Sequence, residues 1–269
     1  MSDQIKDSLL IPRPANRHGT LKWLPSDSSE LFAKNLLTQP DDWLYRTKEV
    51  VYRLNSLGYR CPEFNKIDWA QSIIIKGCSV VEGIGLAEED TLSSRLADLF
   101  NQPVINLGIG GSSILFTLIN TYKLLSNNIR PKLVIELYTN TDRSVFFDRK
   151  TSEAIHLGSW LTDGSKKTGD GFDESYMEAW AKHSIVSNSE KIKNTFHVGI
   201  NEMLWKSAGV PLYQATFMTE PSKTLNLPSI PAAFGGNLDL ARDLMHPGRE
   251  TIKACAKKIF DNIKEKKLL

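Results

Sequence analysis

One serine stands where an α/β protein can expose a nucleophile. Ser79 follows a β-branched apolar run of strand length at residues 73–75 and a break at Gly77. In an open parallel sheet, the loops at the carboxyl ends of the strands line the ligand crevice, so Ser79 lies where chemistry is usually done. A serine hydroxyl is almost never ionised at neutral pH and needs a base, for which a neutral imidazole is suited. Turns between strands and helices also carry Gly and Ser for their geometry, so this segment alone favours a structural role.

Three further segments change that interpretation. A second strand-like run is followed by a glycine-rich turn that holds Gly111, and a third run is followed by Asn140. Near the end of the chain, Asp243 and His246 stand three residues apart. In isolation each of these residues has an ordinary explanation, because Gly and Asn are common in turns and an Asp-x-x-His pair is common at helix starts. Their order along the chain is what gives them weight.

Taken in this order, the four segments resemble the SGNH (GDSL-type) hydrolase family, over roughly residues 72–262. In that family the serine of the first segment is the nucleophile, and a glycine and an asparagine of the next two segments complete an oxyanion hole. A late Asp-x-x-His supplies the base and its orienting carboxylate. The resemblance therefore implies the catalytic residues Ser79, Asp243 and His246, with an oxyanion hole made by Ser79, Gly111 and Asn140.

The residue types suit those roles. Asp243 can return its carboxylate to the ring of His246, hold its orientation and stabilise the imidazolium that forms. The backbone N–H groups of Ser79 and Gly111 and the amide of Asn140 can donate to the oxygen that becomes negative in a tetrahedral intermediate. Losing one such donor typically costs about 3 to 4 kcal/mol of barrier. A glycine in this position lets the backbone approach the reacting carbon closely.

Two departures from the family pattern stand beside these matches. Cys78 precedes the serine where the family has an aspartate, and a thiol does not replace that charge. We expect Cys78 to be a small buried residue under the loop. Tyr138 and Thr139 precede Asn140 where the family usually has glycine, so we expect an oxyanion hole of a different shape.

Composition limits the classes of function. The 269 residues are 41% hydrophobic and 24% charged with a net charge of +2, which is ordinary for a globular protein and gives no electrostatic footprint for nucleic acid. The three cysteines lack zinc-type spacing and an even count, so we expect neither a disulfide framework nor a metal or other cofactor. No apolar run has the length of a membrane span, and the N-terminus lacks a secretory pattern. We therefore expect a soluble cytoplasmic protein, with no prediction of its oligomeric state.

The alternation of strands and helices predicts an α/β fold, a flavodoxin-like three-layer sandwich with a parallel sheet of the SGNH hydrolase type. Residues 1–60 are expected to form an N-terminal extension that packs on the core, and residues 61–269 the α/β domain. An insertion at about residues 144–188, with loops and short helices around Trp160 and Trp180, is either a substrate-shaping region or a surface elaboration. Other expected elements are a helix capped by Asp90, a helix capped by Ser112 or Ser113, a helix at 189–207, a strand at 210–218, a long loop at 219–238 and a helix at 249–266.

The function we expect is serine-dependent hydrolysis of a carboxylic ester through an acyl-enzyme intermediate. The resemblance implies a small-molecule or carbohydrate ester, or a lipid, as the substrate. Two alternatives stay open: an acyltransferase on the same scaffold, and a non-catalytic binding or structural module, because a fold does not fix a function. The other histidines are fallback bases: His18, His156, His183 and His197.

Overall fold

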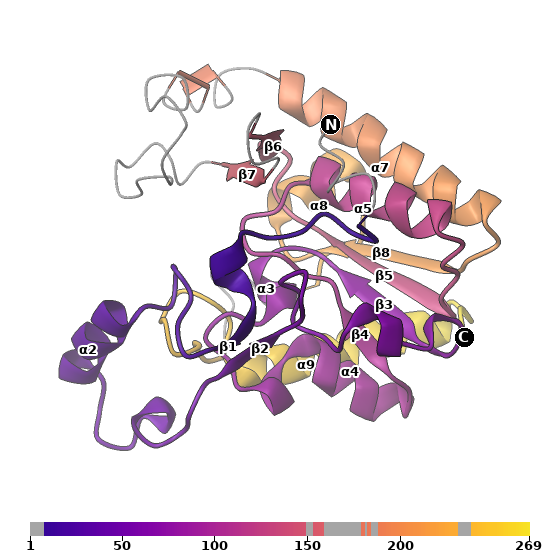
Figure 1. Cartoon of the computed structure of the whole chain (residues 1–269). Coiled ribbons are helices and arrows are strands. Elements are labelled where there is room, and N and C mark those ends of the chain that lie inside the picture. Colours follow the sequence, from indigo (N-terminus) through magenta and orange to yellow (C-terminus); the bar gives the residue numbers. More distant parts are fainter. Residues whose placement is uncertain (1–7, 149–152, 159–178, 181, 184–187, 231–237) are drawn as a thin grey trace.

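A four-stranded parallel sheet forms the centre of the computed structural model, which describes residues 8–148, 153–158, 179–180, 182–183, 188–230 and 238–269 (Figure 1). Its strands are β3 (Ile73–Lys76), β4 (Val104–Asn106), β5 (Leu133–Tyr138) and β8 (Leu212–Thr216). They are hydrogen-bonded in the order β4-β3-β5-β8, so the first strand lies between the second and the third. This flavodoxin-like order is the one that the sequence predicts.

Helices cover both faces of the sheet and make three layers (Figure 1). They are α4 (Leu92–Phe100) and α9 (Arg249–Glu265) on one face, and α5 (Ile114–Ser126) and α7 (Ser189–Ser207) on the other. Because successive residues of a strand point to opposite faces, Ile73 and Ile75 enter the core under α4 and α9, whereas Ile74 enters the other core. Burial on both faces explains why β3 and β5 are apolar almost throughout.

The cap of α4 corrects one sequence prediction. Thr91, not Asp90, is the N-cap, and its hydroxyl accepts the N–H of Ser94. Asp90 is buried just before the helix, where Lys48 and Arg95 pair with its carboxylate at 2.6 and 2.5 Å. A buried carboxylate needs such partners, so Asp90 fixes the extension to this helix. The cap of α5 is Ser113, one of the two predicted serines.

The N-terminal extension contains more regular structure than the sequence predicts. Its elements are η1 (Ala15–Arg17), β1 (Gly19–Leu21), α2 (Ser29–Thr38), η2 (Leu44–Arg46) and β2 (Tyr52–Leu54), with η3 (Phe64–Lys66) and η4 (Trp69–Gln71) leading into the core. Strands β1 and β2 pair antiparallel. Helix α2 was missed because it buries only Asn35 and so has no apolar stripe, although Ser28 caps it.

The aromatic residues of the extension divide into two groups. Four aromatic residues stack on one another within the extension, with ring centroids 5.3 to 5.9 Å apart: Trp23, Phe32, Trp43 and Tyr45. Tyr59 is instead buried in the core on the α5 side of the sheet. The extension therefore has a small apolar centre of its own, which also includes Ile84 from the α/β domain.

Two other segments differ from the predictions. Within residues 144–188 the structure contains an antiparallel hairpin of β6 (Ser144–Phe147) and β7 (Ala154–Leu157), where loops and short helices were expected. Residues 219–238 are not one loop, because α8 (Thr219–Leu225) occupies their start. Trp160 lies outside the described residues, and Trp180 is a partly exposed helical residue.

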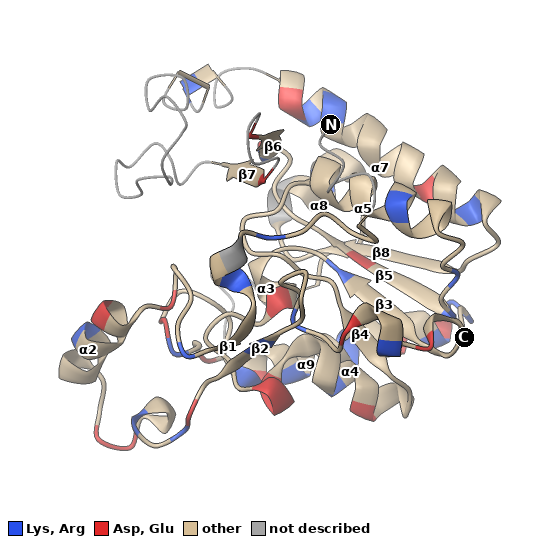
Figure 2. Ribbon diagram, viewed as in Figure 1, with Lys and Arg blue, Asp and Glu red and all other residues tan. Residues whose placement is uncertain are grey.

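Acidic and basic residues are interspersed over the helices and loops (Figure 2). This mixture agrees with the small net charge of +2. Within the described residues, every helix is too short or too polar to cross a lipid bilayer.

Candidate active site

Ser79 is the first residue of a short helix, α3 (Ser79–Glu82), that begins directly after β3. The prediction that Ser79 follows a strand is confirmed. The prediction that it lies in a loop is wrong, because it begins a helix. A Cβ at Gly77 would lie 2.6 Å from Cγ2 of Val81 and 2.8 Å from the carbonyl oxygen of Leu137, which explains the glycine. Cys78 is buried, as predicted. The Ser79 hydroxyl is half-buried and makes no hydrogen bond within the described residues.

Gly111 and Asn140 follow β4 and β5, the two strands that flank β3. The turns after these parallel strands therefore share one edge of the sheet with Ser79. The N–H of Gly111 and the side-chain amide of Asn140 have no hydrogen-bond partner in the part of the chain that the structure describes. The neighbouring Gly110 approaches the serine closely, because a Cβ there would lie 3.8 Å from Cβ of Ser79.

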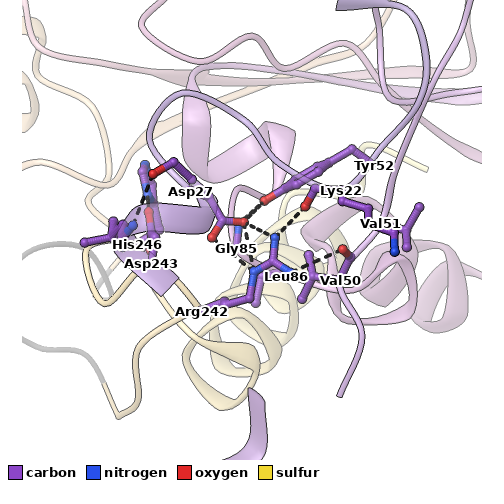
Figure 3. Close-up of polar contacts among 12 residues, drawn as sticks. Lys22, Asp27, Val50, Val51, Tyr52, Gly85, Leu86, Arg242, Asp243 and His246 are labelled. Carbon is purple, nitrogen blue, oxygen red and sulfur yellow. Dashed lines mark hydrogen bonds and ion pairs between the residues drawn. The ribbon is translucent and has the colours of Figure 1, made fainter. Parts of the chain in front are cut away.

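The Asp243 and His246 side chains contact each other in a tight turn (Figure 3). Oδ2 of Asp243 lies 2.5 Å from Nδ1 of His246, and Oδ1 accepts the backbone N–H groups of Met245 and His246, each at 3.0 Å. Leu244 adopts a left-handed conformation with φ of 55°, which closes the turn. The carboxylate thus fixes the ring, and within the described residues Nε2 has no hydrogen-bond partner.

The turn that holds His246 lies against the loop that follows α3. The N–H of Arg242 donates to the carbonyl of Gly85 at 3.1 Å, and a Cβ at Gly85 would lie 2.8 Å from Cβ of Ala241. Within the described residues no hydrogen bond joins the Ser79 hydroxyl to His246. The structure therefore brings the two loops together and pairs Asp243 with His246, and it leaves the serine hydroxyl unpaired.

Asp27 of the extension anchors both loops, a role that the sequence analysis missed (Figure 3). Its buried carboxylate pairs with Arg242 at 2.7 Å and accepts a hydrogen bond from the hydroxyl of Tyr52. The same Tyr52 oxygen accepts the N–H of Gly85 at 2.7 Å. Burial, together with the charge of Asp27, raises the pKa of Tyr52, which therefore remains a hydrogen-bond donor. Asp27, Tyr52 and Arg242 thus connect the loop that follows α3 to the turn that holds Asp243.

Arg242 is held from several directions. Its guanidinium donates to the carbonyl oxygen of Lys22 at 2.7 Å and lies 4.1 Å from the ring centroid of Trp23. Its own carbonyl accepts the side-chain amide of Asn35 at 3.0 Å. The position of Arg242 immediately before Asp243 was the only signal in the sequence, and no spacing rule connects it to Asp27.

Glu82, the last residue of α3, links the serine helix to the glycine turn. Its buried carboxylate forms an ion pair with Arg13 and accepts the N–H of Gly110 at 2.6 Å. Burial alone would raise the pKa of Glu82, but the Arg13 guanidinium outweighs it and holds that pKa below its usual value. Glu82 is therefore charged at neutral pH. No motif in the sequence includes Arg13 or Glu82.

The other described histidines have different surroundings. His18 contacts the carbonyl of Arg13 at 3.2 Å, His197 contacts the amide of Asn194 at 3.1 Å, and His156 packs edge-on against Phe116. Among the histidines in the described ranges, only His246 contacts a carboxylate. The described residues also contain no group of three or more His, Cys, Asp or Glu side chains placed to hold a metal ion.

Comparison with known proteins gives matches among solved structures only. No family model and no curated protein matches the chain. An acetyl xylan esterase, Est2A, from the rumen bacterium Butyrivibrio proteoclasticus is similar with a TM-score of 0.48 and 10% identity over 73% of this chain. This chain spans 64% of the length of that esterase.

Two further solved structures are similar over most of their own length. A protein of the G-D-S-L family from Desulfitobacterium hafniense has a TM-score of 0.44 and 11% identity, with 71% of this chain and 98% of that chain covered. The acetyl xylan esterase AlAXEase has a TM-score of 0.33 and 15% identity, with 71% and 99% covered.

Proposed function

We propose that this chain is a serine hydrolase of the SGNH (GDSL) type that cleaves carboxylic esters of small molecules or carbohydrates. The observation that carries the proposal is the contact of 2.5 Å between Asp243 and His246, in a turn that is hydrogen-bonded to the loop following Ser79. Ser79 and His246 are far apart in the sequence, so local structure does not explain the approach of the segments that carry them. A carboxylate on one ring nitrogen with the other nitrogen unpaired is the arrangement that a general base requires.

The reaction would proceed through an acyl-enzyme. Nε2 of His246 takes the proton of the Ser79 hydroxyl as its oxygen attacks the ester carbonyl carbon, and the carbonyl electrons move to the oxygen. The N–H groups of Ser79 and Gly111 and the amide of Asn140 stabilise that oxyanion, a role supported by their lack of other partners in the described residues. The alcohol then leaves with the proton from His246. Water, activated by the same imidazole, releases the acid and restores Ser79.

A fluorophosphonate probe tests the proposal, because the probe reacts only with an activated hydroxyl. We expect one covalent label, and peptide mass spectrometry should locate it on Ser79. Ser112→Ala is the matched control, since this serine lies at the same edge of the sheet but donates its hydroxyl to the carbonyl of Gly77 at 3.1 Å. That variant should label as the unmodified protein does. The absence of any label would favour a binding module instead, and a label on another residue would show that Ser79 is not the nucleophile.

His246→Ala is expected to lower kcat for an aryl acetate by roughly 10²- to 10⁴-fold, the usual contribution of a general base. The loss follows because no other described group is placed to accept the serine proton from this side. His197→Ala serves as the control, because its ring is half-buried on α7 and faces Asn194. If His246→Ala keeps the unmodified rate, His246 is not the base.

A further inference from the structure

A cavity of about 160 Å³ opens at the same edge of the sheet as the candidate active site. Its walls come from η1 and the segment before it, the turn after β4, helix α5 and strand β7, and include Arg13, Arg17, Gly110, Phe116 and His156. Gly110 belongs to the glycine turn that approaches Ser79, since a Cβ at this position would lie 3.8 Å from Cβ of the serine. Gly110 therefore belongs both to the wall of the cavity and to the turn beside the proposed nucleophile.

The charges around this cavity do not cancel. Two guanidinium groups, of Arg13 and Arg17, lie near one carboxylate, that of Glu82, and Glu82 is paired with Arg13. Nη1 of Arg17 is buried and has no hydrogen-bond partner within the described residues. Burial, followed by repulsion from Arg13, lowers the pKa of Arg17 to about 10, so its side chain is still a cation at neutral pH. The cavity thus contains a positive charge with an unused donor.

His156, the other polar residue of the wall, is uncharged. Burial lowers the pKa of His156 to about 3, with the charges of Arg13 and Arg143 acting in the same direction, so the ring is neutral. Its Nδ1 is also buried without a hydrogen-bond partner among the described residues. The remaining wall, formed by Phe116, prolines and Ala154, is largely apolar. A ligand that fits these walls has an anionic group on a largely apolar body.

We propose that this cavity binds a carboxylate group of the substrate, so that the preferred ester carries a negative charge; this inference rests on the proposed esterase function. The guanidinium fork of Arg17 matches the two oxygens of a carboxylate. Glu82 keeps Arg13 occupied, which leaves Arg17 as the residue that recognises the anion.

Calorimetric titration with benzoate and benzamide tests the binding step without any turnover. The two compounds have nearly the same shape and differ in charge. We expect benzoate to bind at least about tenfold more tightly than benzamide, and Arg17→Gln to remove that preference, as expected for one charge-assisted hydrogen bond. Arg17→Lys should retain part of it. Arg53→Gln, at an exposed position of β2, is the matched control and should bind benzoate normally. Equal binding of both compounds, or unchanged benzoate binding by Arg17→Gln, would overturn the proposal.

Turnover separates this inference from the function on which it rests. Two substrate pairs place the charge in the alcohol or in the acyl part: 4-carboxyphenyl acetate against 4-carbamoylphenyl acetate, and the 4-nitrophenyl monoester of adipic acid against that of adipamic acid. We expect kcat/KM to favour the anionic member of one pair by about tenfold, and Arg17→Gln to equalise that pair. Equal turnover within both pairs would overturn the carboxylate site and leave the esterase standing. If benzoate binds but no ester is cleaved, the proposed function fails and the anion site stands.

Discussion

Replacing Ser79 with alanine is expected to abolish the hydrolysis of 4-nitrophenyl acetate and to leave the protein folded. The attacking oxygen is lost, and removing the nucleophile of a serine triad lowers kcat by roughly 10⁶-fold. Stability should hardly change, because the hydroxyl makes no hydrogen bond within the described residues and the alanine keeps the Cβ at the start of α3. Steady-state kinetics measure the loss, and thermal unfolding measures the fold.

Cys78→Ala is the matched control for this experiment. Cys78 precedes Ser79 directly and is the nearest residue along the chain that offers an alternative nucleophile, but its side chain is buried. We expect the alanine variant to keep the activity within a few fold. If Ser79→Ala retained more than a few per cent of the rate while Cys78→Ala lost it, the thiol would be the nucleophile and the serine assignment would be wrong.

The sheet could be predicted because its strands are buried on both faces. Residues 73–75 contain only β-branched apolar side chains, and the runs that form β3 and β4 are each followed by a glycine turn and then by a helix. Alternation of strands and helices allows few topologies besides a parallel sheet with right-handed crossovers. Helix α7 was predicted with its observed limits, Ser189–Ser207, and α9 was predicted to within one residue.

Two charged residues are buried inside the sheet, and they are compatible with the predicted strands because they neutralise each other. Lys76 and Glu136 stand opposite each other in β3 and β5, are both fully buried, and their charged groups lie 3.0 Å apart. Lys76 also donates to the carbonyl of Thr117 and to the hydroxyl of Thr121. Each residue alone would argue against a buried strand, and only the register of the two strands makes them compatible with it.

The parts that could not be predicted depend on contacts between distant segments. Asp27 and Arg242 are 215 positions apart, and no local pattern connects them. The contact between Asp243 and His246 was predictable because it spans three residues. The hairpin of β6 and β7 and the carboxylate of Glu82 beside Gly110 likewise arise from tertiary packing, which overrides weak local preference. For the same reason the sequence indicated the candidate site residues but not the residues that hold them in position.

Asp27→Asn is expected to lower the free energy of unfolding by about 3 to 5 kcal/mol, because breaking a buried ion pair leaves the guanidinium of Arg242 without its countercharge. It should also reduce kcat. Arg242 directly precedes Asp243, and its backbone N–H donates to the carbonyl of Gly85 in the loop that follows α3. A shift of the Arg242 side chain therefore changes the distance between nucleophile and base. Chemical denaturation and steady-state kinetics on the same samples measure the two effects.

The loss of kcat distinguishes a positioning role from a purely structural one. Measured well below the unfolding temperature, Asp27→Asn should lose kcat at nearly constant KM, because the substrate contacts are intact and the catalytic groups are displaced. Tyr52→Phe removes the acceptor for the N–H of Gly85 and should cost less, about 1 to 3 kcal/mol, with a smaller loss of kcat in the same direction. Asp41→Asn is the control, because that carboxylate lies exposed in the same extension. If Asp27→Asn unfolds more easily but keeps full kcat when folded, the extension stabilises the domain without positioning His246 against Ser79.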